Sequence, residues 1–388
     1  MAWIEASDKI KSLPVYPFVK LEQIKAQAKK DGRDLIDFGI GDPDLPTPEF
    51  ILQAMDQAVR DPENHKYPTS AGLLSFREAA SRFLARRFKI KMAPERIVSL
   101  IGSKEGLAHF PLGYLNAGDL ALVPSPAYPV YKIGTLFAGG ESYIFPLKEE
   151  KGFLPDLEAI PKGFLSRAKI LFLNYPNNPT GAVCDLSLLE RAVYYAKKYR
   201  FWVVQDAAYC EVCFDGYLAP SIFEVKGAED CALEFHSLSK TFNMTGWRLG
   251  FVAGAKDAID TLAKVKSNID SGVFQAVQQA GAVALDQGEA AIQEMRKIYQ
   301  RRRDLLAAAL DSAGLKYLKP KATFYFWVKA PKGMSSEQMA GAMLDQAGII
   351  CSPGSGYGPE GEGYVRFALV VKEERMEEAA KRLKRLDL

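Results

Sequence analysis

Residues 237–250 read SLSKTFNMTGWRLG, and this short stretch gathers groups that can do chemistry. The hydroxyls of Ser237 and Ser239 precede the amine of Lys240, and the guanidinium of Arg248 follows. Hydroxyls and a guanidinium suit a phosphate, because they donate hydrogen bonds and Arg adds a permanent, fork-shaped charge. An amine between them suits covalent attachment to a carbonyl group. The stretch therefore predicts a site that holds a phosphate beside an aldehyde.

Further polar residues stand where apolar, strand-like segments end. Asp206 ends FWVVQD, Asn174 ends KILFLN, and SPAYPVY follows DLALV. Ser103 and Lys104 follow IVSLIG, at a place that suits the start of a helix. Parallel strands of an open α/β sheet direct their carboxyl ends to one edge, and ligands bind beyond that edge. We therefore expect these side chains to meet in one place.

This set of groups suits one common cofactor. The hydroxyls and Arg248 suit a phosphate, and the carboxylate of Asp206 suits a protonated ring nitrogen across a flat aromatic ring. Lys240 suits a Schiff base. Pyridoxal 5′-phosphate combines a phosphate, a pyridine nitrogen and an aldehyde.

The segments that must position these residues alternate between strands and helices. Apolar strands are expected over 96–102, 119–125, 169–174, 201–206, 231–239 and 249–254, with a helix over 187–199. This alternation predicts a mostly parallel sheet that is covered on both faces. The last hundred residues differ: a charged helix over 289–314 precedes strands over 323–330 and 364–370. They predict a smaller α+β domain, with the charges of 289–314 on a solvent-facing helix side.

The expected domains are a large one over 46–288 and a small C-terminal one over 289–388. Residues 1–45 are expected to pack with the small domain.

Composition excludes several classes of protein. The 388 residues include 50 Lys and Arg against 47 Asp and Glu, and a net charge of +3 gives no case for nucleic acid or an anionic membrane. No apolar run reaches eighteen residues, and the N-terminus lacks a secretory signal, so a cytoplasmic protein is expected. The five cysteines, including the lone pair Cys210 and Cys213, and the three histidines (His65, His109 and His236) show no metal spacing. We expect no metal and reduced thiols.

Seven motifs make the chain resemble the class I and II aminotransferases, which are fold-type I pyridoxal-phosphate enzymes. They are SLSKTFNMTGWRLG, NYPNNPTG, DAAY, GSKEGL, SPAYPVY, KYPTSAGLLSFREA and VRFAL, and the resemblance covers essentially the whole chain. It implies an α/β fold with a mostly parallel seven-stranded sheet between helices, and a smaller α+β domain. It also implies a homodimer with shared active sites, amino acid and 2-oxo acid substrates, and a ping-pong transfer of the amino group.

The resemblance implies a role for each matching residue. Lys240 would form the Schiff base and carry protons, and Asp206 would pair with the ring nitrogen. Asn178 and Tyr209 would hydrogen-bond the ring oxygen, and Tyr128 would stack on the ring. The phosphate would be held by Ser103, Lys104, Ser237, Ser239 and Arg248, with Tyr67 donated across the dimer interface. Arg366 would bind the substrate α-carboxylate, helped by the loop that contains Gly41 and by Asn178.

Several stretches are most similar to the LL-diaminopimelate branch of this family, which functions in lysine biosynthesis. They are LPVYPFVKLEQI, DFGIGDPDLPTP, GSKEGLAHFPLGYLNAGD and SPAYPVY. In that branch Tyr16 and Lys104 would hold the far end of the substrate. Longer members have an Asn-Gly pair where residues 268–272 read NIDSG here.

Plainer interpretations stand beside these roles. Asp206 could cap a helix, Asn178 could be a turn residue beside Pro179, and Tyr128 could simply fill the core. Tyr67 could belong to an ordinary turn. At the level of function, aspartate, alanine or aromatic aminotransferases, a C–S β-lyase of the same fold, and a cofactor-bearing regulator remain alternatives.

Overall fold

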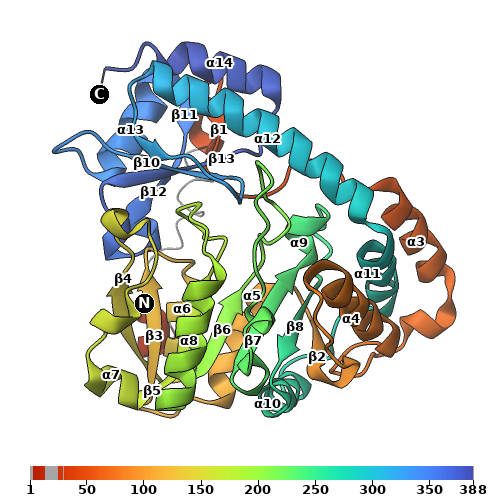
Figure 1. Cartoon of the computed structure of the whole chain (residues 1–388). Coiled ribbons are helices and arrows are strands. Elements are labelled where there is room, and N and C mark those ends of the chain that lie inside the picture. The colour runs from red at the N-terminus through yellow and green to blue at the C-terminus, as the bar shows by residue number, and fades with distance from the viewer. Residues whose placement is uncertain (1–2, 14–24, 29, 388) are drawn as a thin grey trace.

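A computed structural model describes residues 3–13, 25–28 and 30–387 (Figure 1). Its larger sheet has seven strands in the order β2-β8-β7-β6-β5-β3-β4. Strand β8 runs antiparallel to both neighbours, and the other neighbouring pairs are parallel. The bounds are β2 (Ile97–Leu100), β3 (Leu120–Ser125), β4 (Glu141–Pro146), β5 (Ala168–Asn174), β6 (Trp202–Asp206), β7 (Ala232–Ser237) and β8 (Gly250–Gly254). This confirms the predicted mostly parallel, seven-stranded sheet.

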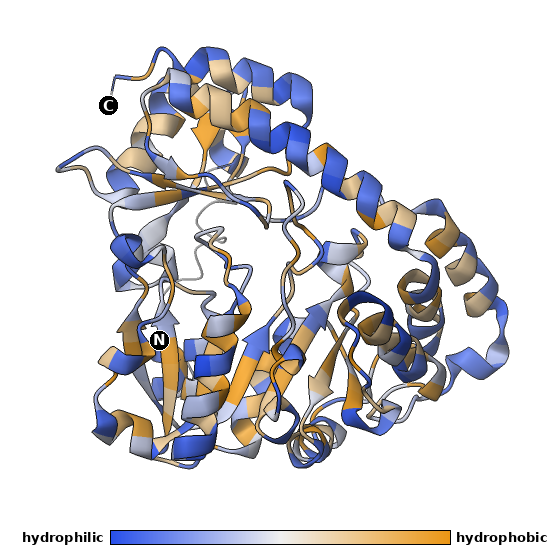
Figure 2. Cartoon of the chain, in the orientation of Figure 1, coloured by the Kyte–Doolittle hydropathy of each residue, from blue (hydrophilic) through white to orange (hydrophobic). Residues whose placement is uncertain are grey.

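The central strands of this sheet bury both faces. In β6, Val203 packs into one apolar cluster and Val204 into another, because successive side chains of a strand point to opposite faces. One face packs against α5 (Ser103–His109), α6 (Val130–Phe137) and α10 (Lys256–Ser267). The other packs against α4 (Leu74–Phe88), α8 (Leu186–Tyr199) and α11 (Gln275–Gln287). Figure 2 shows the apolar colour concentrated on the strands, with polar residues on the outer sides of the helices.

The smaller sheet lies across the top of the larger one in Figure 1 and has the order β12-β13-β10-β9. Its strands are β9 (Tyr317–Leu318), β10 (Tyr325–Lys329), β12 (Ser352–Pro353) and β13 (Tyr364–Ala368). A separate pair joins β1 (Ile36–Asp37) in parallel to β11 (Ile349–Ile350), which ties the N-terminal part to the C-terminal part. The domain boundaries at 45 and 288 stay a prediction. The remaining helices are α1 (Asp8–Lys11), α3 (Glu49–Arg60), α7 (Lys162–Arg167), α9 (Leu238–Thr241), α12 (Glu289–Ser312), α13 (Ser336–Ala347) and α14 (Glu373–Leu383).

The charged helix α12 departs from the expectation of a solvated face. Arg302 and Arg303 are buried. Arg302 donates from Nη1 and Nη2 to the two carboxylate oxygens of Asp44, at 2.6 and 2.9 Å. Arg303 donates from Nη2 to Oδ1 of Asp215 at 2.9 Å. The prediction was wrong at these two positions, because carboxylates far away in the sequence neutralise guanidiniums that the fold covers.

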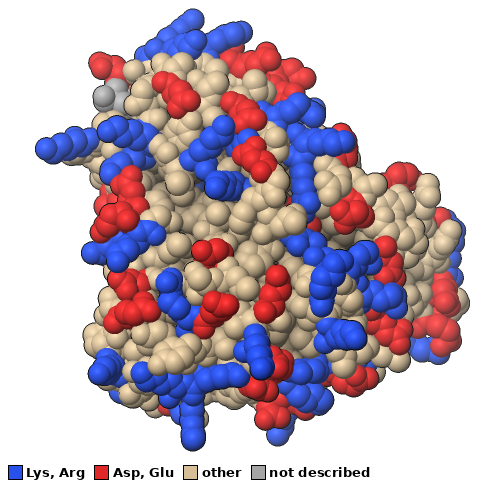
Figure 3. All heavy atoms as spheres, in the orientation of Figure 1, with Lys and Arg blue, Asp and Glu red and all other residues tan. Residues whose placement is uncertain are grey.

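The surface gives no sign of one dominant charge. On the face shown in Figure 3, acidic and basic side chains are intermixed. Within the part of the chain that the structure describes, every helix is too short or too polar to serve as a membrane span.

Candidate active site

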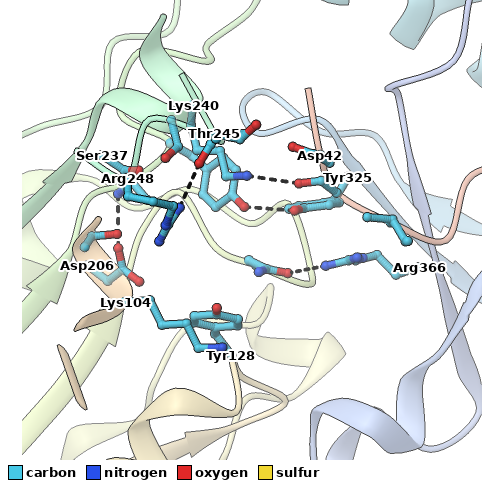
Figure 4. A pocket seen from close by; sticks show the side chains of 18 of the residues that line it. Asp42, Lys104, Tyr128, Asp206, Ser237, Lys240, Thr245, Arg248, Tyr325 and Arg366 are labelled. Atoms are coloured by element: carbon cyan, nitrogen blue, oxygen red, sulfur yellow. Dashed lines mark hydrogen bonds between the residues drawn. The ribbon is translucent and has the colours of Figure 1, made fainter. Parts of the chain in front are cut away.

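A cavity of about 480 Å³ opens beyond the carboxyl ends of the central strands, and residues of the smaller sheet line it as well (Figure 4). It brings together predicted residues that are far apart in the sequence, from Gly41 to Arg366. The predicted residues that line it are Gly41, Ser103, Lys104, Tyr128, Asn178, Asp206, Tyr209, Ser237, Ser239, Lys240, Arg248 and Arg366. Tyr16 lies outside the described residues. Tyr67 does not line this cavity, and its side chain is 86% exposed.

Hydroxyls and a guanidinium gather at one end of the cavity. Ser237 ends β7, Ser239 lies one residue into α9, and Ser103 begins α5. Arg248 reaches the same place from a backbone with φ of 56°, and its Nη1 donates to the carbonyl oxygen of Thr245 at 2.9 Å. A Cβ on Gly102 would lie 2.4 Å from Nη2 of Arg248, so only glycine leaves room for this guanidinium. This cradle fits a phosphate.

Asp206 lies at the end of β6 and is buried. Burial raises the pKa of its carboxyl to about 6, while hydrogen bonds from the Tyr131 hydroxyl and the Ala208 N–H oppose the rise. Oδ2 accepts from Tyr131 at 2.7 Å, and Oδ1 accepts from the Ala208 N–H at 3.2 Å. A turn rather than a helix follows Asp206, so the interpretation as a helix cap was wrong. A buried carboxyl that lines a cavity is suited to receive a cationic nitrogen.

Lys240 extends from α9 into the same cavity, where Nζ donates to the carbonyl oxygen of Gly41 at 3.0 Å. Burial lowers the pKa of the amine to about 8. Asp42 acts in the opposite direction, and the guanidiniums of Arg366 and Arg248 add to the decrease. A substantial fraction of this amine is therefore neutral near physiological pH, which a nucleophile requires.

Arg366 is 1% exposed and projects from β13 toward Asn178. Nη1 donates to Oδ1 of Asn178 at 2.8 Å, and Nη2 donates to the carbonyl oxygen of Gly39 at 3.0 Å. Because the amide oxygen of Asn178 accepts from Arg366, its NH₂ group remains the part that can donate elsewhere. Asn178 is also part of a turn held by Asn174, whose Oδ1 accepts from the Asn178 N–H at 2.8 Å. The turn interpretation and the site interpretation are thus compatible.

Aromatic residues line the rest of the cavity. The ring of Tyr128 is only partly buried and lies 6.0 Å from Nζ of Lys104, so Tyr128 does more than fill the core. The hydroxyl of Tyr209 lies 2.8 Å from that of Tyr325. Burial, and then the neighbouring Tyr325, raises the pKa of Tyr209 well above its usual value.

Sequence reasoning missed several residues of this site. Tyr325, Tyr357, Asp42 and Thr245 line the cavity, and Tyr131 contacts Asp206 from behind it. Thr245 stands inside the stretch that first indicated the site, and Asp42 follows Gly41 directly. Their proximity to predicted residues was the available signal. Tyr325 had no comparable signal, because it begins an apolar strand of the smaller sheet.

The donor set fits pyridoxal 5′-phosphate in its chemistry. The cavity has a hydroxyl and guanidinium cradle, a carboxyl that burial makes receptive to a cation, a lysine of lowered pKa and flat aromatic side chains. Each matches a different part of that cofactor.

Comparisons with known proteins agree with this geometry. The family described as "Aminotransferase class I and II" matches residues 33–383. The LL-diaminopimelate aminotransferase of Moorella thermoacetica is 50% identical, over 99% of this chain and 98% of that protein. The substrate-bound structure of BacF from Bacillus subtilis has a TM-score of 0.95 at 37% identity, covering 100% of this chain and 99% of that one. A Thermus thermophilus aspartate aminotransferase variant has a TM-score of 0.92 at 30% identity, covering 98% and 99%. The chain therefore belongs to the class I and II aminotransferases, pyridoxal-phosphate-dependent enzymes of fold type I.

Proposed function

We propose that this enzyme is an LL-diaminopimelate:2-oxoglutarate aminotransferase that serves lysine biosynthesis in the cytoplasm. The observation that carries the transaminase chemistry is the convergence of Lys240, Asp206 and Arg366 on one cavity. The support for this substrate is that curated relatives matching nearly the whole chain carry that activity in their names.

The proposed roles are those that the family resemblance implies, and the residues concerned line one cavity. When bound, pyridoxal phosphate supplies an aldehyde that captures the amino group and a ring that accepts an electron pair from the substrate Cα. Ser103, Lys104, Ser237, Ser239 and Arg248 would hold the phosphate. Asp206 would keep a proton on the ring nitrogen. Tyr209 and the NH₂ group of Asn178 would donate to the ring oxygen, and Tyr128 would lie against the ring.

Lys240 is proposed as the covalent and proton-carrying residue. Because its pKa is lowered to about 8, Nζ can both give up and take a proton near neutral pH. The carbonyl oxygen of Gly41, 3.0 Å away, holds the amine at the wall of the cavity.

Arg366 is proposed to bind the α-carboxylate that both substrates share. Its burial and its bonds to Asn178 and Gly39 hold the guanidinium plane in place before substrate arrives. The far ends of the two substrates differ, because LL-diaminopimelate carries a carboxylate and an ammonium there, whereas 2-oxoglutarate carries a carboxylate alone. An exposed Lys104 and the hydroxyl of Tyr16 suit such variation better than a second rigid Arg would.

The test is a comparison of kcat/KM for LL-diaminopimelate, aspartate, alanine and phenylalanine with 2-oxoglutarate as acceptor. We expect LL-diaminopimelate to exceed each of the others by more than tenfold, which is about 1.4 kcal/mol of transition-state binding. If aspartate or an aromatic amino acid exceeds it by that margin, the substrate assignment fails and a broader aminotransferase remains. Pyruvate formation from a cysteine conjugate would indicate the β-lyase instead.

A homodimer with shared active sites is the proposed assembly. The support is that Tyr67 is 86% exposed, that Ile269 of the 268–272 segment is exposed as well, and that a Cβ added to Gly272 would lie 3.1 Å from Pro68. Sedimentation should give a dimer, and Tyr67→Phe should weaken cofactor binding without changing the stability of the fold. A fully active monomer would contradict this assembly.

A further inference from the structure

We propose that Tyr325 is a positioning residue that couples the phenol of Tyr209 to the carboxylate-binding fork of Arg366. This proposal rests on the function proposed above. Tyr325 begins β10, is 2% exposed and lines the cavity from the smaller sheet. Tyr209 belongs to the loop after β6 of the larger sheet, so its contact with Tyr325 joins the two sheets.

The hydroxyl of Tyr325 lies among groups that the chemistry uses. It is 2.8 Å from the hydroxyl of Tyr209. It also lies against Gly41, where an added Cβ would come within 2.0 Å of it. The carbonyl oxygen of Gly41 in turn accepts from Lys240 at 3.0 Å. One hydroxyl therefore contacts Tyr209 and the peptide that orients the lysine.

The ring of Tyr325 supports the guanidinium of Arg366. Cζ of Arg366 lies 4.0 Å from the ring centroid of Tyr325, within the range of a cation–π interaction. The register of β10 and β13 pairs Arg366 with Trp327, which places Tyr325 diagonally across from it. Since Arg366 is buried, the negative face of the ring offsets part of the cost of desolvating its charge.

The backbone before Tyr325 holds the ring in place. Thr323 adopts φ of 67°, which is uncommon for a β-branched residue, and its N–H donates to Val212 at 2.7 Å. Its Oγ1 accepts from the N–H of Tyr325 at 3.1 Å. A Cβ on Gly181 would lie 3.0 Å from the carbonyl oxygen of Tyr325, so the backbone of Gly181 packs closely against the backbone of Tyr325.

Two variants separate the two roles. Tyr325→Phe removes only the hydroxyl, so Tyr209 loses a partner and becomes a weaker donor. The bound cofactor then keeps more negative charge on its ring oxygen. We expect the pH midpoint of its visible absorbance to rise by about half a pH unit or more, because one unit corresponds to 1.36 kcal/mol. The KM for glutamate should stay within about twofold.

Tyr325→Leu removes the ring as well. We expect the KM for glutamate and the inhibition constant of glutarate, a plain dicarboxylate, to rise about tenfold because Arg366 loses its aromatic support. Tyr317→Phe is the matched control: its hydroxyl donates to Oδ1 of Asp311 at 2.8 Å, in the same sheet but outside the cavity. It should change neither the absorbance midpoint nor the KM.

An unchanged midpoint in Tyr325→Phe would overturn the proposal, and so would unchanged carboxylate binding in Tyr325→Leu. A phenylalanine variant that raises the KM as much as the leucine variant would also overturn it, because the roles of hydroxyl and ring would then not be separable. These measurements use glutamate and glutarate, so they do not depend on the assigned amino donor. A wild-type enzyme that uses glutamate but not LL-diaminopimelate would overturn the substrate assignment alone.

Discussion

The hydroxyl of Tyr131 donates a 2.7 Å hydrogen bond to Oδ2 of Asp206 inside the closed core. Tyr131 is itself held by a stacked contact with Phe172, at 5.1 Å between ring centroids. The bond favours the ionised carboxyl against the burial that raises its pKa to about 6. A residue of the helix after β3 thus controls the acid that we assign to the ring nitrogen.

Tyr131→Phe should raise the pKa of Asp206 in the cofactor-free protein above 6. A hydrogen bond of about 1 kcal/mol corresponds to a rise of about 0.5–1 pH unit. Since the cofactor nitrogen needs the ionised carboxyl, cofactor affinity should fall as pH decreases through the pKa, and it should fall at higher pH in the variant. Fluorescence titration with pyridoxal phosphate at several pH values between 5 and 8 measures the affinity. This range brackets the Asp206 pKa of about 6.

Tyr217→Phe is the control for Tyr131→Phe. Its hydroxyl donates to the carbonyl oxygen of Cys184 at 2.8 Å, away from the cavity. The control should keep the wild-type pH profile. Identical profiles for all three proteins would show that Tyr131 does not tune Asp206.

Lys240→Met should make the cofactor-free protein more stable at pH 7, by about 3 kcal/mol. The folded-state pKa of about 8 lies below the ordinary value of 10.5, so between these values the unfolded chain binds more protons than the folded one. The stability of the wild type relative to the variant should therefore rise from pH 8 to 10.5, and the penalty should be largest below pH 8. Urea denaturation across this range measures it. If the difference in free energy of unfolding between the two proteins does not change with pH, the amine is not desolvated.

Gly102→Ala should weaken the binding of pyridoxal phosphate about tenfold. The new Cβ would lie 2.4 Å from Nη2 of Arg248 and would displace the guanidinium from the phosphate cradle. Gly118→Ala is the matched control, because Gly118 also has positive φ, at 84°, but has nothing within 4 Å of an added Cβ. Gly102→Ala should also lose about 1–3 kcal/mol of stability through backbone strain, because φ of 71° with ψ of 152° is a conformation essentially restricted to glycine. Only Gly102→Ala should lose affinity, and retained affinity would argue against Arg248 as a phosphate ligand.

Lys266→Met should destabilise the fold by about 3–5 kcal/mol, because it leaves two carboxylates without their cation. The Lys266 side chain is fully buried, and Nζ lies 3.0 Å from Oε2 of Glu105 and 3.1 Å from Oδ2 of Asp270. Glu105 belongs to α5, the helix that begins with Ser103, so cofactor affinity should fall as well.

The neighbouring exposed lysine offers the control for Lys266→Met. Lys264 lies on the same helix, and Lys264→Met should change the free energy of unfolding by less than about 0.5 kcal/mol. Equal losses in the two variants would mean that the buried ion pairs contribute little.

The sequence alone determined the class of fold and most of the site. Asp206, Asn174, Ser103 and Ser237 could be placed at one edge because each stands where an apolar strand ends, and parallel strands end together. Short apolar runs and turn residues are local features of the sequence, so they can be recognised without knowing which segments pack against them. The strand β4 was not predicted, because it lies at the edge of the sheet and only one of its six residues is buried.

Only the tertiary structure decided which distant groups meet. Arg366 reaches Asn178 across 188 positions, and Arg302 reaches Asp44 across 258. In the sequence, Tyr325 is one residue of an apolar strand. In the fold, its ring centroid lies 4.0 Å from Cζ of Arg366, and its hydroxyl lies 2.8 Å from that of Tyr209. Such contacts, and the pKa values of Asp206 and Lys240, depend on desolvation and on charges from several segments. No local pattern carries that information, because burial is a property of the packed chain as a whole.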